Sequence, residues 1–213
     1  MIYSVIACMG GGKTLFSTNY AIDYESKNPN SSIIANYSLI GFKNFTFTQF
    51  GFLPFSKLEK SLIIIDDISA VKNQISGLLQ VIANSSRKLD LDIILTAQYY
   101  TMIPRSVREL SKLVIVQYDK KSDILFLKVQ KSVGHSEAME FTKHYVRNAV
   151  ENAKDRYNTN EIVSFATDKD IVNEIIKISE DKEDIAKNIE FFTQSETKRK
   201  KYRKLVALHL ANQ

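Results

Sequence analysis

The feature that most constrains the fold lies at the amino end, where residues 2–16 read IYSVIACMGGGKTLF. An apolar, β-prone segment (2–7) runs into a glycine-rich turn, and Lys13 and Thr14 then open a run of helix-forming residues. Glycines let the backbone bend so that successive N–H groups point at phosphate oxygens, and a helix N-terminus adds partial positive charge. This order predicts a phosphate-binding loop, with a glycine turn that binds nothing as the alternative.

The loop follows the pattern G-x-x-x-x-G-K-[ST], except that its first position is Ala7. That position needs a small residue more than it needs a positive φ, so alanine is tolerable. In such a loop Lys13 reaches the β- and γ-phosphates and the Thr14 hydroxyl completes a Mg²⁺ shell. The residues predicted to contact the nucleotide are Met9, Gly10, Gly11, Gly12, Lys13, Thr14 and Leu15.

A second block, SLIIIDDIS at 61–69, reads as a strand buried on both faces that ends in Asp66 and Asp67. Carboxylates at the end of a buried strand are costly unless a cation meets them, and ligands bind at the carboxyl ends of parallel strands. Asp66 is therefore predicted to hold Mg²⁺ and Asp67 to act as general base on the attacking water. Many ATPases have glutamate at the second position. The alternative is that Asp67 caps a helix running to Asn84.

The third block is SRKLDLDIILTAQ at 86–98, where a buried strand over 91–96 delivers Gln98 just past its end. A glutamine there can bond both the γ-phosphate and the attacking water, although a polar loop residue is the plain alternative. Arg87 precedes this strand, and Arg105 and Arg108 follow it. An arginine can stabilise phosphoryl-transfer charge in cis or from a neighbouring subunit, but most arginines are solvated surface residues.

The remaining pattern predicts a helix over 14–25, a short strand over 32–35, and a β-hairpin from 113–117 and 124–131. The phenylalanines of 36–60 indicate either packing under a long loop or a surface for stacking bases. Helical periodicity is read around 144–157, 169–179 and 182–210, where the isoleucines of 171–178 form a stripe for core or oligomer contacts.

Composition and charge limit the class of protein. No apolar run approaches the roughly 18 residues of a membrane span, and the N-terminus does not resemble a signal peptide. With one cysteine, Cys8, no internal disulfide is expected, and the three histidines show no metal-ligand spacing. The net charge of +5 is uneven: 198–204 carries six positive charges, and 161–197 holds ten acidic and four basic groups. This balance is compatible with nucleic acid or another charged partner.

These blocks together resemble the FtsK–HerA superfamily of P-loop motor ATPases. They are similar to its small viral branch, the genome-packaging ATPases of double-stranded DNA viruses with internal membranes, including turreted icosahedral viruses of archaea. The resemblance rests on ACMGGGKT at 7–14, LIIIDD at 62–67 and SRKLDLDIILTAQ at 86–98. It is supported further by IPRSVREL at 103–110, the hairpin and YNTNEIV at 157–163, which follow in the order that the family shows. The departures are Ala7 and the aspartate at position 67.

The resemblance implies an α/β P-loop NTPase fold (RecA/ASCE-like), with a mainly parallel sheet, an antiparallel hairpin at one edge and a helical C-terminal region. We expect an ATPase core over 1–165 and a helical extension with a basic tail over 166–213. ATP and Mg²⁺ are the implied ligands, with Lys13 and Thr14 for phosphate and metal, Asp66 and Asp67 for metal and water, and Gln98 as sensor. Arg87 best matches the family's arginine finger, which reaches the neighbouring subunit's nucleotide, and Arg108 is second.

The implied function is a motor that packages viral double-stranded DNA into a preformed capsid. Its implied partners are DNA backbone phosphates, proteins of the capsid vertex or inner membrane, and other subunits in a ring of six or five. Its implied place is the host cytoplasm or the virion vertex. The alternatives are a Zot-like phage assembly ATPase and an ATP-dependent switch or scaffold; a small-molecule kinase is the weakest, since no arginine-rich lid is recognisable. The basic run at 198–204 can hold DNA, dock to a capsid or form a solvated helix face.

Overall fold

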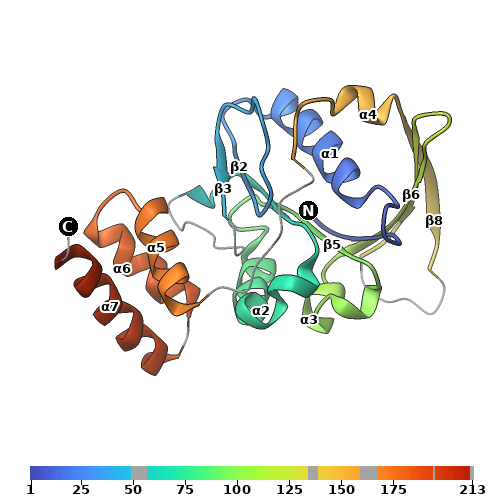
Figure 1. Cartoon of the computed structure of the whole chain (residues 1–213). Helices are drawn as coiled ribbons and strands as arrows, with labels where there is room; N and C mark the ends of the chain where they lie inside the picture. Colours follow the sequence, from blue (N-terminus) through green and yellow to red (C-terminus); the bar gives the residue numbers. More distant parts are fainter. Residues whose placement is uncertain (49–56, 134–138, 159–166, 194, 212–213) are drawn as a thin grey trace.

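The structure is a computed structural model, and it describes residues 1–48, 57–133, 139–158, 167–193 and 195–211, without the side chains of 70–78. One mixed sheet forms its centre. Its strands are β1 (Ile2–Ile6), β2 (Ser32–Ala35), β3 (Phe45–Phe47), β4 (Ser61–Ile65), β5 (Asp92–Ala97), β6 (Lys112–Asp119), β7 (Ile124–Gln130) and β8 (Phe141–Arg147). They lie in the order β3-β2-β4-β5-β1-β6-β7-β8 (Figure 1). All pairings from β3 to β6 are parallel and the last two are antiparallel, which confirms the predicted mainly parallel α/β sheet.

The helices either cover the two faces of this sheet or lie beside it. They are α1 (Lys13–Lys27), α2 (Ile68–Ser85), the 3₁₀ turn η2 (Tyr100–Met102), α3 (Arg105–Arg108), α4 (Ala149–Asn152), α5 (Asp168–Ile178), α6 (Lys182–Phe192) and α7 (Glu196–Ala211). Figure 1 shows α1 and α4 on one face of the sheet and α2 and α3 on the other. The parallel strands therefore run between two apolar layers, and their carboxyl ends meet at one edge.

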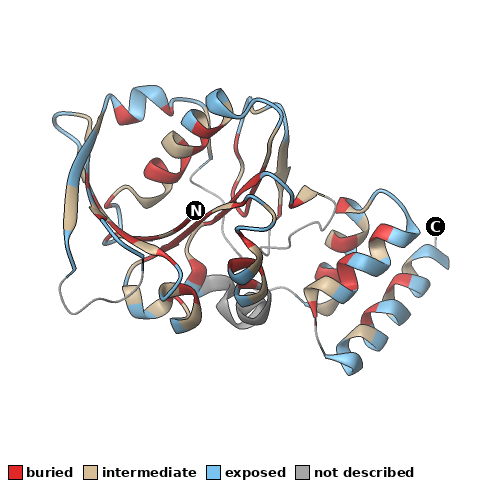
Figure 2. Cartoon of the chain, turned by 180° about the vertical axis from the view of Figure 1, so that it is seen from behind, coloured by how far each residue is buried: buried red, intermediate tan, exposed pale blue. Residues whose placement is uncertain are grey.

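Burial on both faces explains why β4 is a continuous apolar run. Leu62 and Ile64 belong to the apolar cluster on the α1 side, whereas Ile63 and Ile65 belong to the cluster on the α2 side. All of β4 is buried. A strand with only one covered face would alternate apolar and polar residues. The central strands are accordingly red in Figure 2.

The structure corrects the prediction for the region around 144–157. The helical periodicity there is misleading, because residues 141–147 form β8, which pairs antiparallel with β7 from Ile124↔Arg147 to Gln130↔Phe141. Only the short α4 follows it. Pairing with a formed neighbour decides between helix and strand in such a segment, and local sequence does not record that pairing.

The C-terminal helices α5, α6 and α7 pack together as a small bundle beside the sheet (Figure 1). They share an apolar cluster that includes Ile175, Ile189 and Tyr202, and Phe192 packs against both this cluster and the sheet's. The segment 182–210, read as one helical stretch, is two helices, since α6 ends at Phe192 and α7 begins at Glu196.

Two other expectations concern the aromatic loop and membranes. Phe42 and Phe45 pack against the α1-side cluster, as the packing interpretation predicts. Phe50, Phe52 and Phe55 lie outside the described residues.

Within the described ranges, no helix combines the length and apolarity that a bilayer crossing requires.

Candidate active site

Four neighbouring strands, β2, β4, β5 and β1, end at one place in the sheet. Asn36 follows β2, Asp66 and Asp67 follow β4, Gln98 follows β5, and the glycine loop follows β1. Ligands of open parallel sheets bind at this carboxyl edge. The topology thus gathers the three sequence blocks, which lie far apart along the chain.

The glycine loop has backbone geometry that side chains would disturb. Gly10 and Gly12 have φ of +70° and +93°, which other residues rarely adopt. A Cβ at Gly11 would lie 2.9 Å from the Ala7 Cβ, and one at Gly12 would lie 2.7 Å from Leu125 Cδ2. Ala7 itself is buried and is not among the positive-φ residues, so its methyl group fits because Gly11 has none.

Lys13 and Thr14 are the first two residues of α1, which begins close to the end of β4. Lys13 Nζ donates to the carbonyl oxygens of Ala7 (3.1 Å) and Cys8 (3.2 Å), so the ammonium group lies against its own loop. Thr14 Oγ1 donates to Asp66 Oδ2 at 2.6 Å. The loop helix and the end of β4 are therefore in direct contact.

Asp66 is a half-buried carboxylate held mainly by hydroxyl groups. Burial raises its pKa, and hydrogen bonds from Thr14 and Thr96 together with the nearby Lys13 charge act in the opposite direction. Hydroxyl donors compensate a buried negative charge only in part, and a cation compensates it better. Asp66 is thus placed as a metal ligand would be.

Thr96 is a site residue that sequence reasoning missed. Its Oγ1 donates to Asp66 Oδ1 (2.6 Å) and accepts from the Asp67 backbone N–H (2.8 Å). One buried hydroxyl therefore fixes both consecutive aspartates from the neighbouring strand. The available signal was a single polar residue inside the apolar run IILTA.

Asn36 is the second missed residue. Its side-chain Oδ1 accepts from the Asp66 backbone N–H (2.6 Å), and its Nδ2 donates to the Asp66 backbone carbonyl (2.8 Å). The side chain is 2% exposed. This two-point contact extends the ladder between β2 and β4 by one residue and orients the end of β4.

Asp67 occupies the N-cap position of α2 with φ of +47°, and its side chain makes no capping hydrogen bond. Instead Ser69 Oγ donates to Asp67 Oδ1. Gln98 is half-buried and follows Ala97, which pairs with Ile6 just before the glycine loop. The structure thus places both predicted catalytic residues at the loop's edge of the sheet.

The two candidate arginine fingers lie at the opposite edge. Arg87 is exposed in the turn before β5, beside Met1 and Leu91. Arg108 lies just before β6, and its guanidinium stacks 5.2 Å from the centroid of the Tyr100 ring. The intervening strands span roughly 13 Å or more, so neither arginine joins Lys13 and Asp66 within one chain.

A backbone strap closes the site on the β2 side. Ile40 N donates to the Arg156 carbonyl (2.8 Å), and Leu39 and Tyr157 form an antiparallel bridge. Tyr157 packs edge-on against Tyr37 at 6.5 Å between centroids, and burial with the Asp66 charge raises the pKa of both phenols. Tyr157 begins the last of the sequence blocks; residues 159–166 lie outside the described residues.

The site fits a Mg²⁺-nucleotide better than a metal held by protein alone. No group of three or more histidine, cysteine, aspartate or glutamate side chains forms a metal cluster among the residues described. Mg²⁺ is typically bound by one or two protein oxygens, with waters and substrate phosphates completing the shell. Thr14 and Asp66, in mutual contact beside a loop that excludes Cβ atoms, are such a donor pair.

No family model matches the sequence, and no curated protein matches it significantly. Solved structures do match. The N-terminal domain of zonular occludens toxin from Neisseria meningitidis aligns with a TM-score of 0.50 and 12% identity over 74% of this chain and 98% of that one. The DNA-packaging ATPase B204 from Sulfolobus turreted icosahedral virus aligns with a TM-score of 0.46 and 12% sequence identity. That alignment covers 66% of this chain and 95% of that one. The sheet order, the glycine loop and the paired aspartates give this chain the fold of a P-loop NTPase.

Proposed function

We propose that this protein is an ATPase that uses the glycine loop and the carboxyl edge of β4 and β5 to hydrolyse ATP. The observation that carries the proposal is the half-buried Asp66 carboxylate, which accepts from Thr14 of the loop and from Thr96 of β5 and forms no ion pair with a cation of the described residues. A partly desolvated carboxylate with no cation in contact is costly for the fold. The Mg²⁺ of a bound nucleotide would supply the missing positive charge.

Each residue then has a role that its position supports. The loop N–H groups bind phosphate oxygens, and Lys13 exchanges its two carbonyl contacts for the β- and γ-phosphates. Thr14 and Asp66 hold Mg²⁺, which neutralises charge that develops on the phosphates. Asp67 orients the attacking water and takes its proton on Oδ2, because Oδ1 already accepts from Ser69. Gln98 contacts the water and the γ-phosphate.

The finer proposal is a ring-forming motor that translocates double-stranded DNA into a viral capsid. It is supported by the combined sequence blocks and by the two arginines at the opposite edge of the sheet, which lie too far from their own glycine loop to contact a nucleotide bound there. Arg87 is exposed, whereas Arg108 is stacked on its own Tyr100, so Arg87 is the better finger.

The second candidate is a Zot-like assembly ATPase, which the fold likeness to the zonular occludens toxin domain favours. A switch or scaffold that binds ATP without mechanical work is the third. Both candidates use the same nucleotide site, and they differ from the packaging motor in the response to double-stranded DNA.

The test is steady-state ATP hydrolysis with and without double-stranded DNA, on wild type and Lys13→Ala. We expect DNA to raise the wild-type rate and the substitution to lower it at least about 100-fold, because Lys13 is bonded to transferring phosphates. Intact hydrolysis in Lys13→Ala would contradict the ATPase. Hydrolysis that DNA leaves unchanged, with partner binding that depends on ATP, would favour the switch.

Mixing experiments identify the finger. Arg87→Ala and Arg108→Ala subunits are each mixed with inactive Asp67→Asn subunits. A finger that acts in trans restores activity, because an intact arginine from the Asp67→Asn subunit then faces an intact site. Recovery with Arg108→Ala alone would assign the finger to Arg108.

A further inference from the structure

The outer face of β6, β7 and β8 is a sheet surface that no role has so far used. Side chains alternate along these strands, and Tyr118, Leu125 and Val146 point inward to the α1-side cluster. The opposite face carries three rows set by the strand register. The rows are Gln117–Phe126–Tyr145, Ile115–Lys128–Lys143 and Asp119–Ile124–Arg147. We call these nine residues the outer β face.

Large aromatic side chains are exposed at the centre of the outer β face. Phe126 is 47% exposed and Tyr145 is 60% exposed, and the two are directly paired across β7 and β8. Paired residues on adjacent strands have Cβ atoms about 5 Å apart. The Arg147 guanidinium lies 5.3 Å from the centroid of the Tyr145 ring. The face therefore offers adjacent π surfaces, one of them extended by a stacked cation.

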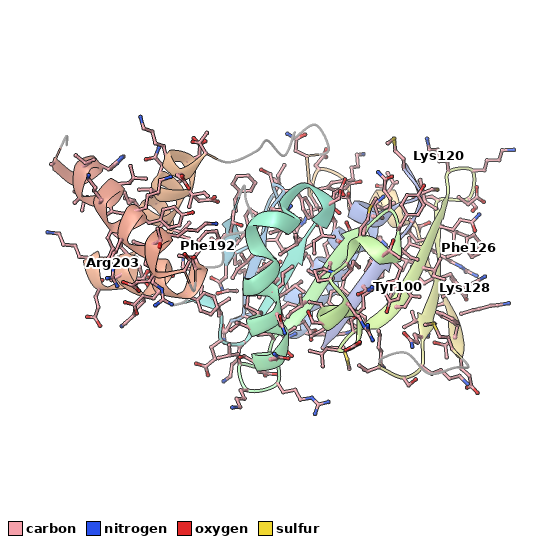
Figure 3. The ribbon with its side chains drawn as sticks, turned by 90° about the horizontal axis from the view of Figure 1, so that it is seen from below. Tyr100, Lys120, Phe126, Lys128, Phe192 and Arg203 are labelled. Carbon is pink, nitrogen blue, oxygen red and sulfur yellow. The ribbon has the colours of Figure 1, made fainter. Side chains whose placement is uncertain are left out.

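Cations surround these rings. Lys128, Lys143 and Arg147 are exposed, and none of the ion pairs formed by the described residues includes them. The only carboxylate of the outer β face, Asp119, accepts from Lys121 N and Ser122 Oγ in the adjoining turn. Figure 3 shows Phe126 and Lys128 together on these strands, with Lys120 near one end.

We propose that the outer β face binds single-stranded nucleic acid, with bases stacked on Phe126 and Tyr145 and phosphates held by Lys128, Lys143 and Arg147. Exposed aromatic rings interleaved with cations are the combination that single strands require. A duplex hides the faces of its bases and offers mainly phosphates, so it would leave the rings unused. A protein interface would favour arginine and aromatics but is depleted in lysine.

The test is fluorescence anisotropy of a labelled 30-nucleotide oligo(dT) and of a duplex of the same length, with the full chain and no ATP. Leaving out ATP separates this proposal from the ATPase, since either can fail alone. We expect wild type to prefer the single strand, and Phe126→Ala/Tyr145→Ala to weaken its Kd at least about tenfold. Tyr145→Phe keeps a stacking ring and is expected to bind as wild type. Circular dichroism confirms that each variant is folded.

Matched charge variants complete the design. Lys128→Ala/Lys143→Ala is expected to reduce the salt slope of single-strand binding by roughly 0.7 for each phosphate that the variant no longer neutralises. Lys169→Ala/Lys177→Ala removes the same charge from exposed positions of α5 and is expected to leave the slope unchanged. An unchanged Kd in the double aromatic variant overturns the proposal, and so does an equal loss of duplex binding. Altered sedimentation of the free variant with unchanged oligo(dT) binding would assign the face to a second copy instead.

Discussion

The carboxyl edge of the sheet and the C-terminal bundle differ in whether their charged side chains form ion pairs. At the edge, Asp66 accepts from two hydroxyl groups and Lys13 donates to backbone carbonyls, and neither charge forms an ion pair within the described part of the chain. In the bundle, three of the six cations of 198–204 already have acidic partners: Lys201 pairs with Asp168, Arg203 with Glu190 and Arg199 with Glu196. Charged side chains without an ion-pair partner, as at the edge, are candidates for binding a ligand. Charged side chains that already form ion pairs, as in the bundle, stabilise the fold.

Outside the residues that the sequence predicted for the site, the largest expected effect is at Thr96, whose hydroxyl joins both aspartates. Thr96→Val keeps the volume but removes two hydrogen bonds, one of them to the Asp66 carboxylate. We expect kcat for ATP to fall about 10- to 100-fold, because a hydrogen bond to a charged group is worth about 1.5–3 kcal/mol.

The control for Thr96 is Thr48→Val, because Thr48 is equally buried and its hydroxyl has no partner among the residues described. It is expected to leave kcat unchanged, and Thr96→Ser is expected to restore most of the activity. A rate unchanged in Thr96→Val would show that the aspartates do not need this bridge.

Asp66→Asn is expected to abolish hydrolysis and to stabilise the ligand-free protein by on the order of 1 kcal/mol, because it removes a half-buried charge that has no ion-pair partner. The amide can still accept from Thr96 and donate to Thr14. Chemical denaturation of both proteins at pH 7 measures the difference, and a less stable variant would mean that the carboxylate is already well compensated.

The same pair of proteins tests the pH dependence. The pKa of Asp66 is raised in the folded protein, so the folded state binds the proton more tightly than the unfolded chain. The wild type therefore loses stability relative to Asp66→Asn as the pH rises from about 4 through the folded-state pKa, and the gap is constant above it. Taking the difference cancels the opposite contributions of Asp119 and Asp123, whose pKa values are lowered.

In the bundle, Arg199→Ala is expected to cost about 1–2 kcal/mol of stability. Its Nε donates to the Thr193 carbonyl (2.7 Å) and its Nη2 to the Glu190 carbonyl (3.3 Å), which satisfies the end of α6. The adjacent Lys200→Ala is the control and should change the free energy of unfolding by less than about 0.5 kcal/mol. Equal effects would mean that the run is a uniform solvated surface.

The smallest expected effect is at Arg203, which pairs with Glu190 at 2.7 Å where both side chains are about half exposed. An exposed pair contributes about 0–1 kcal/mol and is screened by salt. Arg203→Ala should therefore lower the melting temperature slightly in low salt and not in 1 M NaCl. A large loss that persists in salt would place this pair among the structural contacts of the bundle.

The sequence by itself determined those features whose residues are contiguous in the chain. The glycine loop into α1, the doubly buried β4 and the apolar β5 each carry their chemistry within one short stretch, so the P-loop fold and its parallel sheet could be predicted. The order of residues within a short stretch is enough for these predictions, because glycines show where the backbone bends and a continuous apolar run shows a strand buried on both faces.

Only the tertiary structure decided the rest. It converted 141–147 into a strand, because pairing with β7 overrides helical periodicity. It brought Asn36 and Thr96 to Asp66 from strands that are adjacent in the sheet but remote in the chain. It also paired half of the basic run on α7 and left the cations of β7 and β8 beside exposed rings. Sequence counts charges, whereas packing determines which of them have partners.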